Sequence, residues 1–396
     1  MADAKALASL AAMFEIDRLL SEPERAAIAR ARRFADSYVG PRAQAWQDAQ
    51  EFPRQALVEA CAQGLADLEL SRDHGGQGLS FIAKLRAIEA IARQDMAFAF
   101  SLVNHHNALT RIARDAKGDV RELVAAMRRG EIVGCTALTE PGAGSDFAAI
   151  RTTARRDGEG WLLDGAKTWI TNAAVAGAVI CYAQTEPGAG WRGIAAFLVR
   201  DDRPGFVREA PLRFHGGSAI GAGGFRLENY RARGEEMLQP PGAGFKAAMA
   251  GINGARTYVA GLCCAMLEAS LETAARYGLQ RRIFGQPILE HEGQRWALAD
   301  IATELEAARL LTDKAALIVQ QGGDAVLAAA HCKKFAVRVA LKGLADCIQL
   351  MGAEGLKSQY VLGRHLTNAK LCAFTDGSTE IQNERIGRHL MQRFSD

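Results

Sequence analysis

One octapeptide in this chain, Thr139–Asp146 (Thr-Glu-Pro-Gly-Ala-Gly-Ser-Asp), combines residues that suit a loop for binding oxygen atoms. Gly142 and Gly144 permit unusual φ angles and a close approach to the backbone, and Pro141 fixes one corner. Free N–H groups in such a loop form a concave site for anionic or carbonyl oxygens. The first six residues recur at Thr185–Gly190 without the Ser-Asp pair, so the first copy is predicted to do more than turn the chain.

Four further segments combine aromatic, cationic or carboxylate side chains with turn residues: Lys167–Asn172, Tyr277–Ile288, Gln349–Gly355 and Thr375–Gln382. Each has an ordinary structural explanation when it is taken alone. Trp169 would be a core residue, Arg281 a solvated charge and Gly352 a helix C-cap. In the last segment, Thr379 and Gln382 form a predicted capping box for the final helix. The order of all five segments along one chain is more specific than any one of them.

The elements that must position these segments fall into three stretches. Residues 1–131 are predicted to be helical, with a capping box at Ser21–Glu24 and a long helical run, Leu85–Leu109, interrupted near Arg93–Asp95. Residues 132–237 contain short apolar runs separated by turn residues, which predicts an antiparallel β-domain. Residues 238–396 return to amphipathic helices of a bundle. The order helix, sheet, helix predicts an α+β fold.

One motif in the β-domain resembles a nucleotide-binding fingerprint. The segment Gly188–Gly193 matches GxGxxG, but that fingerprint requires a strand before it and a helix after it. Because strands are expected on both sides here, the segment is predicted to be a hairpin turn.

Composition excludes several classes of function. The 396 residues are 49% hydrophobic with a net charge of +3, which is too small to indicate nucleic-acid binding. No run of about 18 apolar residues predicts a membrane span, and the start of the chain, from Met1, lacks a signal region, so a cytoplasmic protein is expected. The eight cysteines form no CxxC pair and are predicted to be core thiols. His105-His106 is predicted to pack or to line a pocket, and no metal site is expected.

With these motifs the chain resembles the acyl-CoA dehydrogenase family over nearly its whole length. The resemblance implies a helical N-terminal domain (1–131), a middle antiparallel β-domain (132–237) and a C-terminal four-helix bundle (238–396). It also implies a homotetramer that binds FAD and oxidises an acyl-CoA substrate, with an electron-transfer flavoprotein as the electron acceptor.

The resemblance assigns roles to individual residues. The positions implied to bind the cofactor are Thr136, Leu138, Thr139, Gly144, Ser145, Trp169, Thr171, Arg281, Phe284, Gln349, Gly352, Ser378 and Glu380. Among these, Arg281 and Phe284 would reach the FAD of a neighbouring subunit, so cofactor binding and oligomerisation would be coupled. The positions implied to bind the substrate are Ser145, Asn253, Arg256 and Gly377.

The main departure from the family pattern is the catalytic base. Family members usually carry Glu where this chain has Asp376, and Ala255 occupies the second known base position. The resemblance therefore implies that Asp376 takes the α-proton while the β-hydrogen leaves as hydride to flavin N5. Asp is shorter than Glu by about 1.5 Å, and a misplacement of about 1 Å can cost ~10²-fold in rate.

Relatives that oxidise alicyclic thioesters of the cyclohexane-carboxyl-CoA type carry Asp at this position, so a ring-bearing substrate is expected. The alternative is a straight- or branched-chain acyl group, on coenzyme A or on a carrier protein, with a local adjustment of the backbone. A flavoprotein of the same fold with different chemistry is the other alternative. Nitroalkane oxidases also use Asp but carry Arg seven residues on, where this chain has Asn383.

Overall fold

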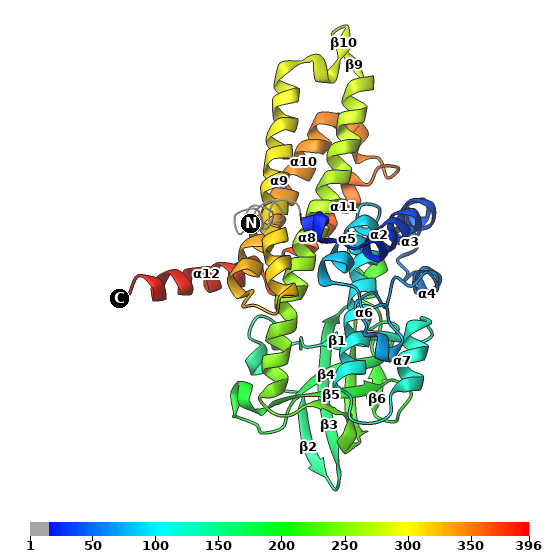
Figure 1. Cartoon of the computed structure of the whole chain (residues 1–396), viewed down its shortest axis with the longest axis vertical. Helices are drawn as coiled ribbons and strands as arrows, with labels where there is room; N and C mark the ends of the chain where they lie inside the picture. The colour runs from blue at the N-terminus through cyan, green and yellow to red at the C-terminus, as the bar shows by residue number, and fades with distance from the viewer. Residues whose placement is uncertain (1–15, 396) are drawn as a thin grey trace, which may run out of the picture. The chain divides into compact units, whose positions relative to one another are not determined.

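The structure is a computed structural model that describes residues 16–395, so the expectation about the start of the chain lies outside the described residues. Backbone contacts divide the chain into two compact units (Figure 1). The helical unit contains the residues up to Gln44, Ser80–Ala99 and the chain from Ile252. The sheet unit contains Ala45–Leu79 and Phe100–Gly251. The helices of the predicted N-terminal domain are therefore shared between the two units.

The sheet unit is built on eight strands in the order β6-β7-β3-β2-β4-β5-β8, with β1 beside β4. The strands are β1 (Val133–Ala137), β2 (Thr153–Asp157), β3 (Gly160–Ile170), β4 (Ala176–Gln184), β5 (Ile194–Arg200), β6 (Phe206–Arg208), β7 (Gly223–Ala232) and β8 (Met237–Gln239). Most neighbours are antiparallel, as predicted. However, β1 and β4 pair in parallel, and so do β2 and β4 where Thr153 meets Gln184. A parallel pair needs a crossover connection, which the hairpin of β2 and β3 supplies between β1 and β4.

Strand β4 forms the centre of the core, and all nine of its residues are buried. Its side chains alternate between two clusters, because successive residues of a strand point to opposite faces. Ile180 and Tyr182 pack in one cluster with Leu109 of α6 (Met96–Asp115) and Val124 of α7 (Arg121–Arg128). Val179, Cys181 and Ala183 pack in the other cluster, with side chains of β5 and β7. A strand covered on both faces reads as a continuous apolar run, as this one does.

The turn between β4 and β5 contains the GxGxxG segment. Gly190–Gly193 forms one short 3₁₀ turn, and the flanking strands pair antiparallel. The prediction of a turn between two strands is confirmed.

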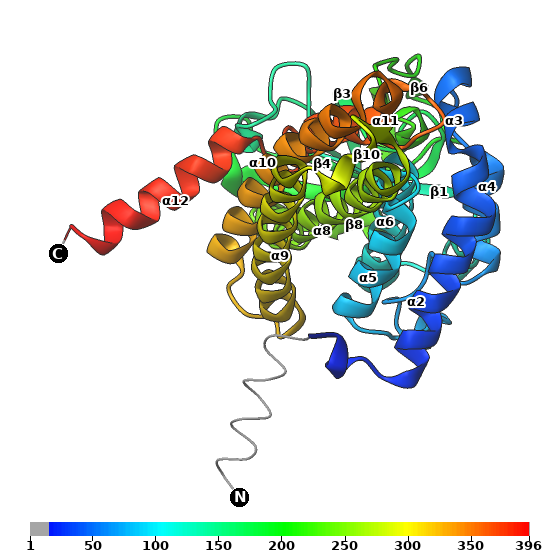
Figure 2. The ribbon, with the colours of Figure 1, turned by 90° about the horizontal axis from the view of Figure 1, so that it is seen from above.

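The helical unit holds the long helices of the chain. They are α2 (Glu22–Phe34), α5 (Phe81–Ala92), α8 (Ala243–Gln280), α9 (Glu292–Gln320), α10 (Val326–Met351), α11 (Leu362–Cys372) and α12 (Thr379–Arg393). Three helices are divided between the helical unit and the sheet unit, namely α3 (Gly40–Ala49), α6 and α8. Helix α10 packs against α9, α11 and α12. In both views α12 extends away from the rest of the bundle (Figures 1 and 2). The sheet unit also contains α4 (Arg54–Ala62).

Local signals predicted several helix ends. The capping box at the start of α2 is confirmed, because the Ser21 N–H donates to Glu24 Oε2 at 2.7 Å. The break between α5 and α6 falls at residues 93–95, as expected. The cap of α12 was predicted one residue too late, since Ser378 is the N-cap. The Gln382 amide donates to the carbonyl oxygens of Gly377 and Ser378 and does not accept from a backbone N–H as in a capping box.

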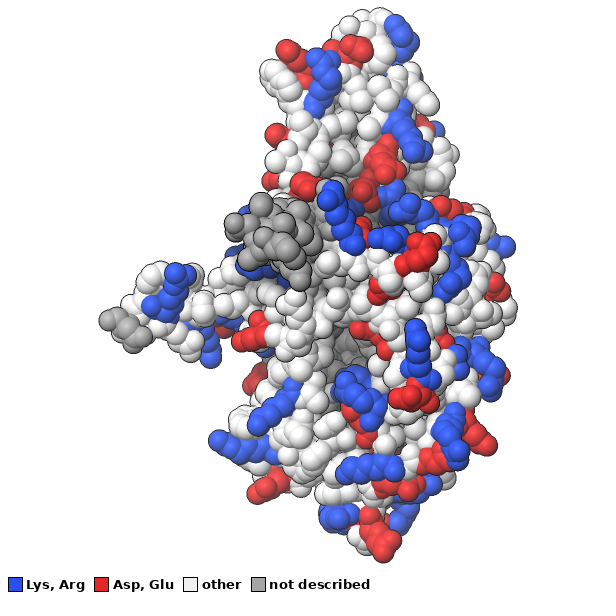
Figure 3. All heavy atoms as spheres, in the orientation of Figure 1, with Lys and Arg blue, Asp and Glu red and all other residues white. Residues whose placement is uncertain are grey.

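Three global expectations can be compared with the structure. All eight cysteines are free and buried. Basic and acidic side chains are interspersed on the face drawn in Figure 3. No helix within residues 16–395 is long and apolar enough to span a bilayer.

Candidate active site

The octapeptide loop is anchored by its own glutamate. Glu140 is buried, and its carboxylate accepts hydrogen bonds from Lys167 Nζ at 2.8 Å and from the N–H groups of Thr152 at 3.0 Å and Arg151 at 2.6 Å. Burial acts to raise the pKa of Glu140, but Lys167 and the other donors lower it overall. Glu140 is therefore a charged structural residue at the base of the loop.

The rest of the octapeptide is open. The N–H of Glu140 donates to the carbonyl of Ala143 at 3.0 Å and the reverse bond is 3.1 Å, which closes a tight turn. Gly144, Ser145 and Asp146 follow this turn and are exposed. A Cβ placed on Gly142 or Gly144 would meet no described atom within 4 Å. The small residues leave space that another molecule can approach closely.

The ends of β1 and β3 are tied together beside this loop. Lys167 Nζ donates to the carbonyl of Leu138 at 3.1 Å, and the N–H of Thr168 donates to the carbonyl of Thr139 at 3.1 Å. Half-buried Thr136 and Leu138 alternate with buried residues, so they share one face of the chain. Trp169 is 59% exposed and has a left-handed φ of +57°.

An amide that sequence reasoning did not single out completes this arrangement. Asn172 is fully buried, accepts from Ser101 Oγ at 2.6 Å, and donates to the carbonyls of Ser101 at 3.0 Å and Gly134 at 3.2 Å. It therefore links α6, β1 and the end of β3, with Thr171 directly before it. The only sequence signal was an amide following an aromatic residue at a strand end. The structure thus ties Leu138 and Thr139 to the end of β3, which leads to Trp169 and Thr171, and places Thr136, Gly144 and Ser145 in the same sheet unit.

A second group of predicted residues meets in the turn between α11 and α12. Lys333 Nζ donates to the carbonyl oxygens of Thr375 and Gly377, and Arg256 Nε donates to the carbonyl oxygen of Asp376 at 3.0 Å. Three successive carbonyl groups therefore accept hydrogen bonds from two cations on different helices. Asp376 has a left-handed φ of +52°, which is uncommon for a residue with a side chain.

The carboxylate of Asp376 is the chemically unusual group of this turn. Its Oδ2 atom is buried and has no hydrogen-bond partner among the described residues. Burial raises the pKa of Asp376, while the charges of Lys333 and Arg256 oppose the rise. Burial also lowers the pKa of Arg256 to about 10, and Arg256 Nη1 donates to Asn253 Oδ1 at 3.1 Å. A carboxylate with a raised pKa and one buried oxygen atom that accepts no hydrogen bond can act as a proton acceptor.

The remaining residues near this turn have simpler environments. Ser378 caps α12, and Glu380 is exposed in its first turn. A hydrogen bond from the Ser378 hydroxyl lowers the pKa of Glu380. Lys333 was missed by sequence reasoning, although a lysine on the apolar stripe of α10 is a detectable signal.

A third group lies at one end of the bundle. Phe284, in the turn between β9 (Arg282–Ile283) and β10 (Gln286–Pro287), is 94% exposed with a φ of +47° (Figure 1). A Cβ on Gly278 would stand 3.4 Å from Leu350, so the end of α8 packs against the end of α10. The predicted residues Arg281, Phe284, Gln349 and Gly352 are all exposed here. Gln349 lies in the last turn of α10 and not in a loop, and Gly352 has a φ of +64°.

Known protein families match the parts of the sequence that contain all three groups of residues. Models of the acyl-CoA dehydrogenase N-terminal, middle and C-terminal domains match residues 21–140, 135–230 and 242–391. A probable acyl-CoA dehydrogenase of Mycobacterium tuberculosis is 31% identical over 363 residues, which are 91% of this chain and 93% of that protein. The chain belongs to the acyl-CoA dehydrogenase family.

Solved structures agree with this assignment. Butyryl-CoA dehydrogenase from Megasphaera elsdenii has a TM-score of 0.89 and 27% identity, covering 94% of this chain and 99% of that chain. A glutaryl-CoA dehydrogenase from Mycobacterium smegmatis in complex with FADH2 has a TM-score of 0.88 and 28% identity, covering 96% and 97%. This acyl-CoA dehydrogenase family member is accordingly an oxidoreductase with the family's fold of helical, β and helical domains.

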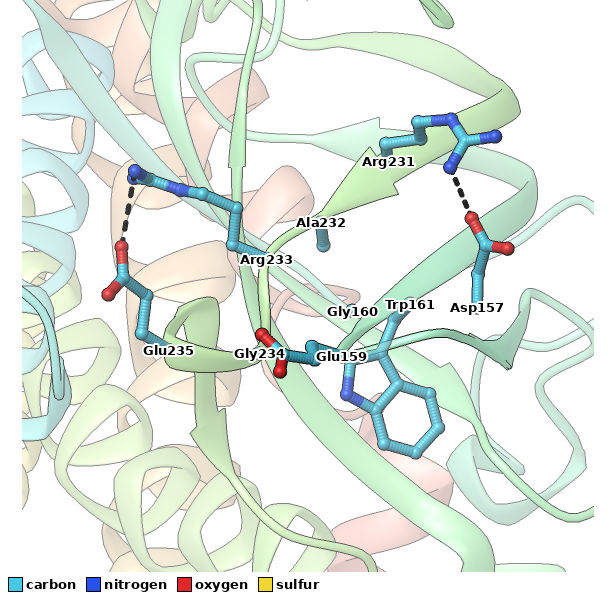
Figure 4. Close-up of a pocket in the computed structure, with 9 residues that line it drawn as sticks. All are labelled: Asp157, Glu159, Gly160, Trp161, Arg231, Ala232, Arg233, Gly234 and Glu235. Carbon is cyan, nitrogen blue, oxygen red and sulfur yellow. Dashed lines mark hydrogen bonds and ion pairs between the residues drawn. The ribbon is translucent and has the colours of Figure 1, made fainter.

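One hollow on the surface lies outside the three groups. It is lined by Asp157, Glu159, Gly160, Trp161, Arg231, Ala232, Arg233, Gly234 and Glu235 (Figure 4). Its charged side chains pair with one another, Arg231 with Asp157 and Arg233 with Glu235. None of the site residues expected for an acyl-CoA dehydrogenase lines it, so the hollow is not a candidate for the active site.

Proposed function

We propose that this protein catalyses the FAD-dependent α,β-dehydrogenation of an acyl-CoA thioester, with Asp376 as the base. The observation that carries the proposal is the buried Oδ2 atom of Asp376, which has no hydrogen-bond partner among the described residues. A carboxylate left without a donor in a buried setting is destabilised, and accepting a proton relieves that destabilisation.

The sheet unit offers features that suit FAD. The open loop around Gly144 and Ser145 supplies backbone donors, and exposed Trp169 supplies a flat apolar surface for an isoalloxazine ring. We infer that Thr136, Leu138, Thr139 and Thr171 complete this contact. Bound FAD supplies the acceptor for the hydride that leaves the β-carbon. The solved relative that contains FADH2 supports the choice of cofactor.

The helical unit supplies the proton chemistry. Asp376 removes the proton from the carbon next to the thioester carbonyl. Its raised pKa makes it a stronger base than an exposed aspartate, and the cations of Arg256 and Lys333 keep a useful fraction ionised. Asn253 holds the Arg256 guanidinium at 3.1 Å. We infer that Ser145 and Gly377 contact the thioester end of the substrate.

For the acyl group we propose an alicyclic ring of the cyclohexane-carboxyl type. The support is the short side chain of Asp376, which suits a carbon held close to the backbone of the turn. A second candidate is a short straight or branched chain, because curated relatives include a bovine mitochondrial protein named as short-chain specific. Asp376 would then reach its proton through the left-handed conformation of the turn.

We further propose a homotetramer in which Arg281, Phe284, Gln349 and Gly352 contact the FAD of a neighbouring subunit. The support is the exposure of these residues together at one end of the bundle, with Phe284 exposed by 94%. Electrons would leave through an electron-transfer flavoprotein, as the resemblance implies.

Anaerobic reduction of the purified protein tests the function. The protein should be yellow, and excess thioester should bleach the visible absorbance of the flavin. The panel contains cyclohexane-carboxyl, linear and branched acyl-CoA, with the matching free acids as controls. Fast reduction by linear thioesters alone would remove the alicyclic proposal. A protein that cannot be reconstituted with FAD, or that no thioester reduces, would contradict the function itself.

A further inference from the structure

A buried lysine beside Asp376 enters the proposed chemistry only through its charge, although it also contacts the turn that carries Asp376. Lys333 lies in α10 and is only 1% exposed, among alanine, cysteine and valine residues of the same buried stripe. A buried ammonium group is unfavourable unless it is hydrogen-bonded or paired. Its Nζ group donates hydrogen bonds to the carbonyl oxygens of Thr375 and Gly377, and the residue between these two is Asp376.

The turn depends on more than one helix for its shape. Lys333 on α10 holds the carbonyl groups on either side of the base, and Arg256 on α8 holds the carbonyl of the base itself. Gln382 on α12 adds a neutral hydrogen bond to the Gly377 carbonyl at 2.9 Å. Asp376 has a φ of +52°, a conformation that a residue with a side chain keeps only where the surroundings enforce it, and Gly377 follows it with a φ of +93° that glycine adopts freely.

We propose that Lys333 is a positioning residue. Its hydrogen bonds and its positive charge fix the Thr375–Gly377 turn, and the turn holds the Asp376 carboxylate where it can accept the substrate proton. The inference rests on the proposed function. Lys333 contacts only the backbone of the turn in this role. It differs from Arg256 in bridging two peptide groups, so its loss frees the turn on both sides of the base.

The electrostatic surroundings define what its removal changes. The charged and titratable groups around the turn are Arg256 and Cys263 on α8, Cys372 on α11, and Glu380 and Arg385 on α12. Burial raises the pKa of Asp376, and two positive charges oppose this rise. The charge of Lys333 has the larger effect and that of Arg256 the smaller. Without it, the pKa of Asp376 rises further, and deprotonation of the base requires a higher pH.

Two variants separate hydrogen bonding from charge. Lys333→Met removes both and should slow anaerobic flavin reduction about 10²-fold, the effect of misplacing a reacting group by about 1 Å. Lys333→Gln keeps an N–H donor without charge and should recover about tenfold of that loss. In both variants the acid limb of the rate profile should move to higher pH. Thioester affinity should change by less than about threefold, because the ground-state contacts remain.

Lys334→Met is the matched control, since this neighbouring lysine is half-buried and outside the turn. It should leave the rate and the pH profile unchanged. Crystal structures of wild type and Lys333→Met provide a readout without activity, and the variant should lose the left-handed conformation of Asp376. If Lys333→Met does not fold, Lys333→Gln decides the question.

A folded Lys333→Gln with the wild-type rate, pH profile and turn conformation would overturn the inference. If wild type itself is reduced by no thioester, the proposed function fails instead, and the crystal structures still test whether Lys333 holds the turn.

Discussion

At the scale of single residues, strained backbone coincides with the predicted chemistry. Among the described residues, six that are not glycine have a left-handed φ, and three of them are Trp169, Phe284 and Asp376. A conformation of this kind destabilises the fold by about 1–3 kcal/mol, so it persists where the surrounding structure enforces it. Each of the three received its predicted role from the family resemblance, without reference to its backbone conformation. Their shared strain supports treating them as functional positions.

Asp376→Asn tests the base directly. The variant should keep its FAD and bind thioester, while the rate of flavin reduction falls by about 10²–10⁴-fold, the usual contribution of a general base. Stopped-flow absorbance under anaerobic conditions measures this rate. Asp346→Asn, at an aspartate of α10 that pairs with Lys342 and lies outside the turn, should behave as wild type. Undiminished reduction in Asp376→Asn would place the base at another residue.

Wild-type flavin reduction should also depend on pH in a defined direction. Burial raises the pKa of Asp376, so this carboxyl group, the proposed base, is protonated at pH values where an ordinary aspartate is ionised. The rate should therefore rise with pH over a range above the usual aspartate pKa of about 4. A pH profile that is flat down to pH 4 would show that Asp376 is not the group that titrates.

At the scale of elements, one buried ion pair joins β3 to the octapeptide loop. Lys167 is fully buried as a side chain, and Glu140 is 5% exposed. Lys167 also holds the Leu138 carbonyl, so a single side chain fixes the end of β1 and the loop that follows it. Breaking such a pair on one side leaves an uncompensated buried charge, whereas replacing both partners is much less damaging.

Lys167→Met should therefore destabilise the protein by about 3–5 kcal/mol and reduce its FAD content. Chemical denaturation and the ratio of flavin to protein absorbance measure the two effects. The double variant Lys167→Met/Glu140→Gln should recover part of the stability, because it removes the unpaired carboxylate. Lys117→Met, at an exposed lysine, serves as the control. Equal stability of Lys167→Met and wild type would show that the pair contributes nothing.

The elements were largely predictable from sequence because their signals are local. The capping box at Ser21 and the apolar run of β4 depend on residues a few positions apart. The contacts that shape the site are not local. Lys333 is more than 40 positions from the turn it holds, and Asn172 is 71 positions from Ser101. No periodicity reveals such pairs, and the parallel register of β1 on β4 was missed for the same reason.

At the scale of the whole molecule, two buried histidines link stability to pH. His105 accepts a hydrogen bond from the Gly134 N–H at Nδ1, at 2.9 Å, and its Nε2 lies 3.0 Å from the Met127 carbonyl. This histidine was predicted to pack or to line a pocket, and it packs, since it is 0% exposed. Burial lowers the pKa of His105 to about 4 and that of His365 to about 3. Both are neutral in the folded protein.

The unfolded chain binds protons at these histidines near their ordinary pKa of about 6.5, before the folded protein does. Folding stability should therefore be fully present above pH 6.5 and decrease as pH falls toward 4, by about 3 kcal/mol for His105. Urea denaturation at pH 7.5, 6.0 and 5.0 measures this slope. His105→Gln should flatten it, and His389→Gln, at an exposed histidine, should not. Identical slopes in all three proteins would contradict the assignment.

Assembly is the last property of the whole molecule that can be tested. Phe284 is 94% exposed, and α12 carries Leu390, Met391 and Phe394 at 46%, 74% and 74% exposure. Removing apolar side chains of this size from water is favourable, so their burial against a second copy of the chain would stabilise an assembly. If the turn containing Phe284 and Arg281 contacts the FAD of a neighbouring subunit, cofactor and assembly must stabilise each other.

Phe284→Ala should then lower FAD retention on dilution and also shift the protein toward smaller assemblies, whereas Leu310→Ala, at another exposed apolar residue, should not lower FAD retention. Removal of FAD from wild type should produce the same shift in assembly, because linkage acts in both directions. Sedimentation velocity with detection at the protein and flavin wavelengths follows both properties in one experiment. The opposite result is that Phe284→Ala and FAD-free wild type both keep the assembly of the FAD-bound protein although FAD is lost. That result would show that the Phe284 side chain contacts the flavin of its own subunit.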